Sequence, residues 1–496
     1  MSKATEHDFE RPKDINGKAY NRTILVAVML IGAFVTIFNQ TLLTTALPKV
    51  MADLNIEPAT GQWLTTAFML TNGIMIPLTA LLISRIHSRT LFLIAMVSFA
   101  IGTLVCSFAE TFELLLTGRI IQAIGAGIMM PLMQTIFLLI FPIEKRGAAM
   151  GMVGLVIGFG PAIGPTLSGW IVDSWDWHYL FYIVLPIAIL DIIFAFFAMK
   201  NVVHLTKPKI DVLSIILSTI GFGSLLYGFS SAGNDGWGDV TVVSTIILGI
   251  VGIVLFSWRQ LTMKNPMLEL RVFKSKIFIF TTIIGCILFM AMIGSTMILP
   301  LYIQNIHGKS ALFSGLVSLP GALVMGIMGP ITGRIFDRYG AKWLAFIGTS
   351  ILVVATIPFL FLTENTSMWT IAIVSALRFL GIGMVMMPLT TAGINSLSRN
   401  MLSHGTAVNN TLRQVAGSIG TAILITIMTN VMTSNMPAKA LAATNPEGYM
   451  SKVIDASLKG INASFLATLI FAIFAFLLTF FVKEKKVSIK QGKMSA

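Results

Sequence analysis

Fourteen apolar segments, each long enough to cross a lipid bilayer, constrain the fold of this chain more than any other feature. A membrane-spanning helix needs about 20 mostly apolar residues. Only 11% of the 496 residues are charged, compared with about 25% in a soluble globular domain. The chain is therefore predicted to be an all-α membrane protein. The segments are expected at 23–47, 62–83, 90–109, 112–141, 147–172, 179–200, 212–231, 241–259, 277–303, 311–333, 342–362, 368–396, 405–432 and 461–482.

The basic residues predict how these segments are oriented. Membrane proteins concentrate Lys and Arg in the loops on the cytoplasmic side. Here the N-terminal tail, the C-terminal tail and alternate loops are rich in them, as at Arg85, Arg89, Lys145 and Arg146. We expect a multi-pass protein of the cytoplasmic membrane with both termini inside, in agreement with the even number of segments. The formal net charge of +13 then reflects topology and does not predict a nucleic-acid partner.

Two parts of the chain repeat the same landmarks. Pro48 ends the first segment, and Arg85 follows it 37 residues later; Pro300 ends the ninth, and Arg338 follows 38 residues later. Such repetition is typical of transporters built from two related halves. We predict two six-helix bundles with an inserted helical hairpin at about 212–259. The predicted division is a tail 1–21, a bundle 22–200, a linker with the hairpin 201–276, a bundle 277–482 and a tail 483–496.

A run of glycine and proline interrupts the fifth segment. Gly160, Gly164 and Ser168 recur every four residues and therefore share one face of a helix, with Pro161 and Pro165 beside them. Proline costs roughly 3 kcal/mol inside a helix in water, but neighbouring helices in a membrane satisfy the freed backbone groups. Small residues at this spacing let another helix approach closely. We interpret the run as a seam between the two halves, with a purely structural close contact as the alternative.

The loop after the tenth segment reads Gly333-Arg-Ile-Phe-Asp337-Arg338-Tyr-Gly340. Asp337 is expected to accept hydrogen bonds from the start of the eleventh helix, where the helix dipole favours a negative charge. Arg338 is expected to bond to the opposite half, and Gly340 to form a tight turn. The alternative is an ordinary polar connection between two helices.

Three charged residues within or beside the apolar segments are candidates for proton coupling. Arg119 shares a helix face with Gln122, and a cation inside a membrane is rare and usually functional; the alternative is that it only satisfies local carbonyls. Asp191 lies deep in the sixth segment, where an acid is suited to exchange protons; the alternative is a structural hydrogen bond. Glu113, near the outer mouth, passes protons inward or belongs to a solvated rim.

Together these patterns resemble the major facilitator superfamily over about residues 22–482. The run around Gly160 resembles the fifth-helix antiporter motif, which is associated with exporters. The loop 333–342 resembles the motif that latches the inner gate, and the run from Arg119 to Pro131 resembles the fourth-helix motif, whose arginine is tied to proton transfer. The resemblance implies the major facilitator fold and the fourteen-helix drug:proton antiporter branch, which includes lincomycin-resistance and multidrug exporters of Gram-positive bacteria.

The sequence departs from the family pattern in two places. Exporters of this branch usually carry an aspartate near the end of the first helix, where this chain has Asn39, which cannot titrate. The first copy of the loop motif has Ser84 in place of the aspartate and His87 in place of the glycine. We therefore expect another acid, with Asp191 favoured, to carry the proton, and a weaker inner latch in the first half.

Polar side chains on the first, fourth and thirteenth segments are expected to line a substrate cavity. The run from Asn409 to Gln414 resembles the thirteenth-helix pattern of the fourteen-helix branch, and Arg413 and Gln414 either contact the substrate or stabilise the bundle. Methionines such as Met386 and Met387 form an adaptable pocket or plain core. The expected cavity residues are Asn39, Gln40, Gln122, Arg413 and Gln414.

Motifs of other functional classes do not occur in the sequence. Without a P-loop lysine motif, ATP is not expected to drive the protein directly. Cys106 and Cys286 lie 180 residues apart and predict neither a disulfide framework nor a metal site. We expect neither an enzyme nor a cofactor, since the proton gradient would drive the protein.

The predicted function is proton-coupled efflux of amphiphilic compounds across the cell membrane by alternating access. The expected partners are a small amphiphilic substrate, protons and the lipid bilayer, without nucleic acid or an obligate protein partner. The alternatives are an exporter of an endogenous lipid, peptide or amino acid, and a transport-inactive membrane sensor.

Overall fold

The computed structural model describes residues 12–206, 208–438 and 445–482. Residues 1–11 of the predicted N-terminal tail 1–21, and the whole predicted C-terminal tail 483–496, lie outside these ranges. The elements are α1 (Arg22–Asp53), α2 (Pro58–Arg85), α3 (Ser88–Ser107), α4 (Phe112–Ile140), η1 (Ile143–Lys145), α5 (Arg146–Ser174), α6 (Tyr179–Ala198), α7 (Val212–Asp235), α8 (Val240–Thr262), η2 (Leu270–Lys274), α9 (Lys276–Leu301), the π-helical η3 (Tyr302–Ile306), α10 (Ala311–Tyr339), α11 (Ala341–Thr356), η4 (Ile357–Phe361), α12 (Met368–Asn395), η5 (Arg399–Met401), α13 (Leu402–Ser434) and α15 (Pro446–Thr479).

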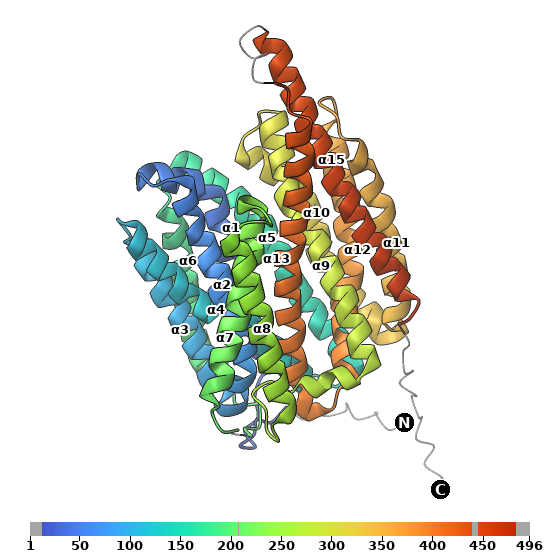
Figure 1. The fold of residues 1–496 in the computed structure, drawn as a ribbon. Helices are drawn as coiled ribbons and strands as arrows, with labels where there is room; N and C mark the ends of the chain where they lie inside the picture. The colour runs from blue at the N-terminus through green and yellow to red at the C-terminus, as the bar shows by residue number, and fades with distance from the viewer. Residues whose placement is uncertain (1–11, 207, 439–444, 483–496) are drawn as a thin grey trace, which may run out of the picture.

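Within the described residues, fourteen helices are long and apolar enough to cross a membrane. The predicted all-α fold and the predicted number of helices are therefore confirmed. The largest difference concerns α15, which begins at Pro446 and not at the start of the apolar segment 461–482. The side chain of Asn445 caps this helix by accepting a hydrogen bond from the Gly448 N–H at 2.9 Å. The polar first part of α15 extends beyond the other helices at the top of Figure 1.

Short polar side chains determine where several helices begin. Asn21, Asp239, Ser275 and Ser310 each precede a helix and accept a hydrogen bond from an N–H of its first turn. These N–H groups have no partner inside the helix, and such a cap stabilises a helix by about 1 kcal/mol. The helices therefore begin at the polar residues that flank the apolar segments.

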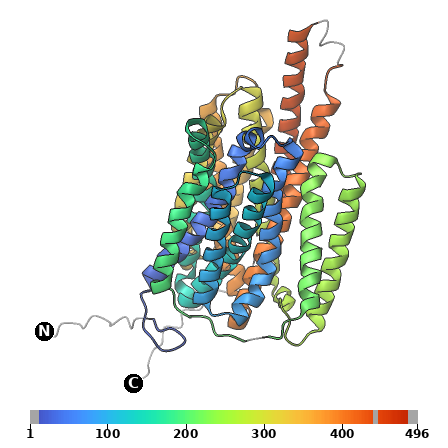
Figure 2. The same cartoon turned by 90° about the vertical axis from the view of Figure 1, so that its left-hand side faces the viewer.

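The helices form two groups that meet along a seam (Figures 1 and 2). We call α1–α6 the N-terminal half and α9–α15 the C-terminal half; the largest contact between them is made by α5, which runs along α10. The first helix begins and the last helix ends at the same end of the bundle, which we call the basic end because Arg85, Arg146 and Arg338 lie there. The residue boundaries 22–200, 201–276 and 277–482 stay a prediction.

The hairpin of α7 and α8 stands beside α2 and α13, so it contacts both halves (Figure 2). At its base, the Arg259 guanidinium donates to both carboxylate oxygens of Asp211 at 2.6 and 2.9 Å. These bonds hold the pKa of Asp211 at about 2, below its usual range. Gln260 donates to Ser214 at 2.6 Å beside them. The base of the hairpin is thus fixed by polar bonds at the basic end.

Large apolar side chains cover the outside of the bundle. Phe197 is 71% exposed, Val240 81% and Trp258 68%. A soluble monomer rarely exposes apolar patches of this extent. The outer surface therefore fits a lipid environment.

Candidate functional site

The seam between the halves is lined by glycines on both sides. A Cβ on Gly158 of α5 would lie 2.5 Å from the backbone nitrogen of Gly326 on α10. There is likewise no room for a Cβ on Gly151, where the Gly329 backbone lies, or on Gly333, where the Gly147 backbone lies. The two helices therefore touch through their backbones, which small residues permit inside a membrane.

The predicted seam residues lie on the other side of α5. Gly160 accepts a hydrogen bond from the Thr41 hydroxyl at 3.3 Å, and the Ser168 hydroxyl donates to the Leu42 carbonyl at 2.6 Å. A Cβ on Gly164 would also meet Thr41. The stripe thus packs against α1 of its own half, and the expectation that it faces the partner half is wrong.

The helical repeat explains this difference. With 3.6 residues per turn, positions nine residues apart lie about 180° apart around a helix. Gly151 faces α10, so Gly160 faces away from it toward α1. Of the two prolines, Pro161 is exposed and Pro165 is half-buried on the same segment. Two faces of α5 can be recognised in the sequence. One carries glycines at 147, 151, 154 and 158, and the other carries small residues at 160, 164 and 168. The sequence does not show which helix packs against each face.

Asp337 joins the halves at the basic end. Its carboxylate accepts hydrogen bonds from the N–H groups of Gly147 at 2.7 Å and Ala148 at 2.9 Å. These N–H groups belong to the first turn of α5, which has no side-chain cap of its own. The expected bond of Asp337 to the start of the eleventh helix is therefore wrong. The helix-dipole argument holds, but it applies to a helix of the opposite half.

The remaining residues of this loop have separate positions. Gly340 has a φ of 82° and forms the predicted tight turn between α10 and α11. The Arg338 guanidinium lies over the neighbouring Tyr339 ring at 5.3 Å, and not against the opposite half as expected. Arg146 makes a cross-half bond in its place, donating to Asn395 at 2.8 Å.

A further cross-half bond lies deeper in the bundle. The side-chain amide of Asn410 on α13 donates to Oε1 of Gln134 on α4 at 2.8 Å. Sequence reasoning did not single out Gln134. Its only signal was a side-chain amide in an apolar helix, which carries no information about its partner.

Arg119 lies at the centre of a buried cluster inside the N-terminal half. It donates to Asn39 at 2.9 Å and to Gln122 at 3.0 Å, and its guanidinium lies 4.2 Å from the centre of the Phe68 ring. Gln122 donates in turn to the Thr103 hydroxyl at 2.9 Å. The structure therefore brings together Asn39, Arg119 and Gln122, while Gln40 is half-buried outside this cluster.

Asp191 is buried inside the N-terminal half and does not point toward lipid. It is 2% exposed, and neither carboxylate oxygen has a hydrogen-bond partner in the described part of the chain. A Cβ on Gly32 of α1 would lie 2.8 Å from one of these oxygens, so α1 packs directly against the acid. Asp191 lies about 10 Å from the basic end of α6 and Arg119 about 10 Å from the opposite end of α4. The two residues are therefore not in contact.

The other expected site residues are scattered. Arg413 donates to the Thr390 hydroxyl at 2.6 Å and to the Met386 carbonyl at 3.2 Å, inside the C-terminal half. Gln414, the next residue, lies against Gly73 of α2 and so faces the opposite half. Glu113 is exposed in the first turn of α4, away from Asp191.

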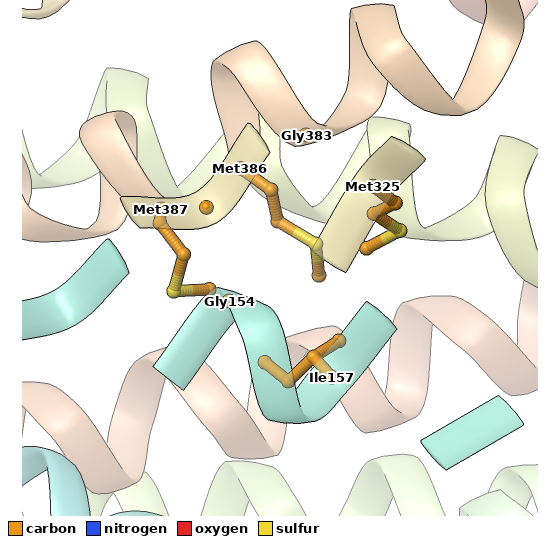
Figure 3. Close-up of a pocket in the computed structure, with 7 residues that line it drawn as sticks. Gly154, Ile157, Met325, Gly383, Met386 and Met387 are labelled. Atoms are coloured by element: carbon orange, nitrogen blue, oxygen red, sulfur yellow. The ribbon is translucent and has the colours of Figure 1, made fainter. Parts of the chain in front are cut away.

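A small apolar gap lies between α5, α10 and α12, at mid-depth in the bundle. Figure 3 shows Met386 and Met387 extending from α12 toward Gly154 and Ile157 of α5. Met325 of α10 closes the gap from a third side. Methionine is flexible and adapts to irregular surfaces. The α12 wall of this gap is therefore formed by side chains that can change conformation.

Two helical bundles with a glycine-lined seam and buried polar clusters define a multi-pass membrane transporter. The sequence pattern of the Major Facilitator Superfamily matches residues 29–421. The chain belongs to this superfamily, and it is accordingly a multi-pass transporter of the cell membrane that carries a small molecule, not an enzyme.

Two relatives support this assignment, and one solved structure shares the fold. The chain is 54% identical to the uncharacterized MFS-type transporter YcnB of Bacillus subtilis (strain 168), over 95% of this chain and 97% of the relative. It is 44% identical to the lincomycin resistance protein LmrB of the same organism, over 94% and 96%. The crystal structure of the human organic anion transporter MFSD10 (TETRAN) has the same fold, with a TM-score of 0.66 and 15% identity over 92% and 99% of the two chains.

Proposed function

We propose that this transporter exports small amphiphilic compounds from the cytoplasm in exchange for protons, by alternating access. The similarity to a lincomycin resistance protein supports export of a toxic compound. The basic end is proposed to face the cytoplasm, because Lys and Arg concentrate on that side. The proton gradient supplies the driving force, without an obligate protein partner.

The observation that carries this proposal is the carboxylate of Asp191. Among the described residues, Asp191 is the one acidic residue that is buried. Its carboxylate oxygens lie against α1 and receive no hydrogen bond there. A charged carboxylate in such a place is unfavourable, so the packed arrangement suits the neutral, protonated form. Loss of the proton favours an arrangement in which α1 and α6 separate enough to admit water. Protonation is thereby coupled to helix movement.

The bonds of Asp337 and Arg146 at the basic end support the proposal that the cytoplasmic entrance is closed in this arrangement. In the proposed cycle these bonds part, the compound enters between the halves, and the halves pivot on the glycine seam. Arg119 and Glu113 are proposed to take part in proton coupling together with Asp191. The transported compound is proposed to bind to the polar residues Asn39, Gln40, Gln122, Arg413 and Gln414.

Inside-out membrane vesicles test the proposal with lincomycin as the compound. Asp191→Asn is expected to abolish proton-driven lincomycin uptake and the accompanying pH change, with normal amounts of protein in the membrane. Asp455→Asn is the matched control, since Asp455 is exposed and forms a surface ion pair with Lys459. Normal uptake by the Asp191→Asn protein would refute the assignment. Transport of a lipid, peptide or amino acid in place of lincomycin would favour an exporter of an endogenous compound. The absence of proton flux with every compound tested would favour a transport-inactive membrane sensor.

A further inference from the structure

Gln134 of α4 and Asn410 of α13 form an amide pair across the two halves. Asn410 donates one amide hydrogen to Oε1 of Gln134 at 2.8 Å and the other to the Thr406 carbonyl at 3.0 Å. Gln134 is fully buried and Asn410 half-buried. The pair belongs to different halves, so the bond exists only while α4 and α13 are in contact.

The depth of this pair relates it to the entry of a compound. Gln134 lies six residues before the end of α4, and Asn410 eight residues after the start of α13. The helical rise places them about 9 and 12 Å from the basic end, deeper than the Asp337 bonds. A compound that passes between α4 and α13 from the basic end reaches this depth only after the amide pair has separated.

The nitrogen of the Gln134 amide has no hydrogen-bond partner in the part of the chain that the structure describes. This Nε2 atom is buried. Buried amide donors are nearly always paired, because an unpaired donor is unfavourable. A neutral acceptor on a bound compound would pair with this donor without bringing an uncompensated charge into the membrane.

We propose that Gln134 is a specificity-determining residue of the transport cycle. Its Oε1 closes the basic end through Asn410. When the halves separate, its amide donates to a neutral acceptor, such as a carbonyl or hydroxyl oxygen, on the entering compound. This inference rests on the proposed function and adds a substrate class to it: compounds with a neutral hydrogen-bond acceptor are preferred over those without one.

Closure is tested without any compound, on the full-length protein in inside-out vesicles. Cys106 and Cys286 are replaced by alanine, and Ile157→Cys places a reporter at the gap of Figure 3, beyond the amide pair. A membrane-impermeant maleimide then reports opening from the basic end. Gln134→Met keeps the length of the side chain and removes the amide. The labelling rate is expected to rise about three- to tenfold, the equivalent of one neutral hydrogen bond.

Two further variants separate closure from a general loss of stability. Gln260→Met makes the same change inside the hairpin, where Gln260 bonds to Ser214, and should leave labelling unchanged. Gln134→Asn shortens one partner and should raise labelling. Adding Asn410→Gln restores the combined length and should return labelling to the original rate. Unchanged labelling in Gln134→Met, or no recovery in the double exchange, would overturn closure by this pair.

Recognition is tested by the dissociation constants of two probes. Lincomycin carries an amide carbonyl and hydroxyls, whereas ethidium is a lipophilic cation without a carbonyl or hydroxyl oxygen. Gln134→Met should weaken lincomycin binding about three- to tenfold and change ethidium binding less than about twofold. Equal weakening of both probes, or of neither, would overturn recognition. Binding of neither probe by the unsubstituted protein would overturn recognition together with the proposed function, while closure is judged by labelling alone.

Discussion

Gly151 of α5 and Gly329 of α10 touch backbone to backbone. The carbonyl oxygen of each residue occupies the place where a Cβ on the other would stand. The two halves therefore meet here without intervening side chains. Interlocked side chains hold packed surfaces in one register, and their absence leaves a smooth surface on which the halves can pivot.

Gly151→Ala is expected to obstruct this pivot. The new methyl group meets the Gly329 backbone, which cannot rotate away, at a cost of about 1–3 kcal/mol. Gly154→Ala is the matched change, because its methyl group would meet the Met387 side chain at 2.9 Å and would be no closer than an ordinary contact, 3.4 Å, to the Gly329 backbone. Initial rates of compound uptake into inside-out vesicles should fall about tenfold for Gly151→Ala and less than about threefold for Gly154→Ala. Equal rates in the two variants would contradict a backbone pivot at Gly151.

Asp337→Ala should open the basic end. The substitution removes a charged acceptor from two backbone N–H groups, and hydrogen bonds to charged groups each contribute about 1.5–3 kcal/mol. Labelling of a cysteine at position 157 from the basic side should rise about tenfold or more. Asp239→Ala removes a carboxylate that also accepts from two N–H groups, at 2.8 and 3.1 Å, but inside the hairpin. If both variants label alike, Asp337 does not act as a latch between the halves.

Asn39→Asp should add a titratable group to the Arg119 cluster. Asn39 accepts a hydrogen bond from Arg119 at 2.9 Å, so the new carboxylate would pair with a buried cation. The variant is expected to fold, because an opposite charge beside Arg119 compensates both groups. The pH profile of transport should gain a second titration step, measured as uptake rate from pH 5 to 9. A profile identical to that of the unsubstituted protein would show that this position is not coupled to the cycle.

Asp211 should make the hairpin sensitive to acid. Its pKa is held at about 2 by Arg259, below the value near 3.9 of an unfolded chain. The stabilisation is therefore fully present above about pH 4 and lost as the pH falls toward 2. Asp211→Asn should lower the Tm at pH 7 by about 2–4 °C and weaken the fall in Tm between pH 4 and 2. An unaltered pH dependence of Tm in detergent would rule out this contribution.

The sequence was sufficient for the number and position of the helices, because lipid demands long apolar runs. It could not predict α15 before residue 461, since the polar first part of this helix gives no such run. It also could not assign the faces of α5. The Gly151 and Gly160 faces have the same chemistry, and only the packing decides that one meets α10 and the other α1.

The partners of the polar residues were harder to predict than the residues themselves. Asp337 was identified as a helix-start acceptor, but its helix lies 190 residues away in the chain. Asn39 and Arg119 were each singled out, and their mutual bond emerged only from the fold. Gln134 gave no signal beyond its amide. Residue chemistry can be read locally, whereas contacts across the halves depend on how two bundles dock.

The central claim is that Asp191 exchanges its proton as the compound binds. Purified protein in weakly buffered detergent solution tests it directly, by recording proton release with a pH electrode on addition of lincomycin. The unsubstituted protein and Asp455→Asn should release about one proton per bound molecule, and Asp191→Asn should release none while it still binds lincomycin. Equal proton release by the Asp191→Asn protein would contradict the account.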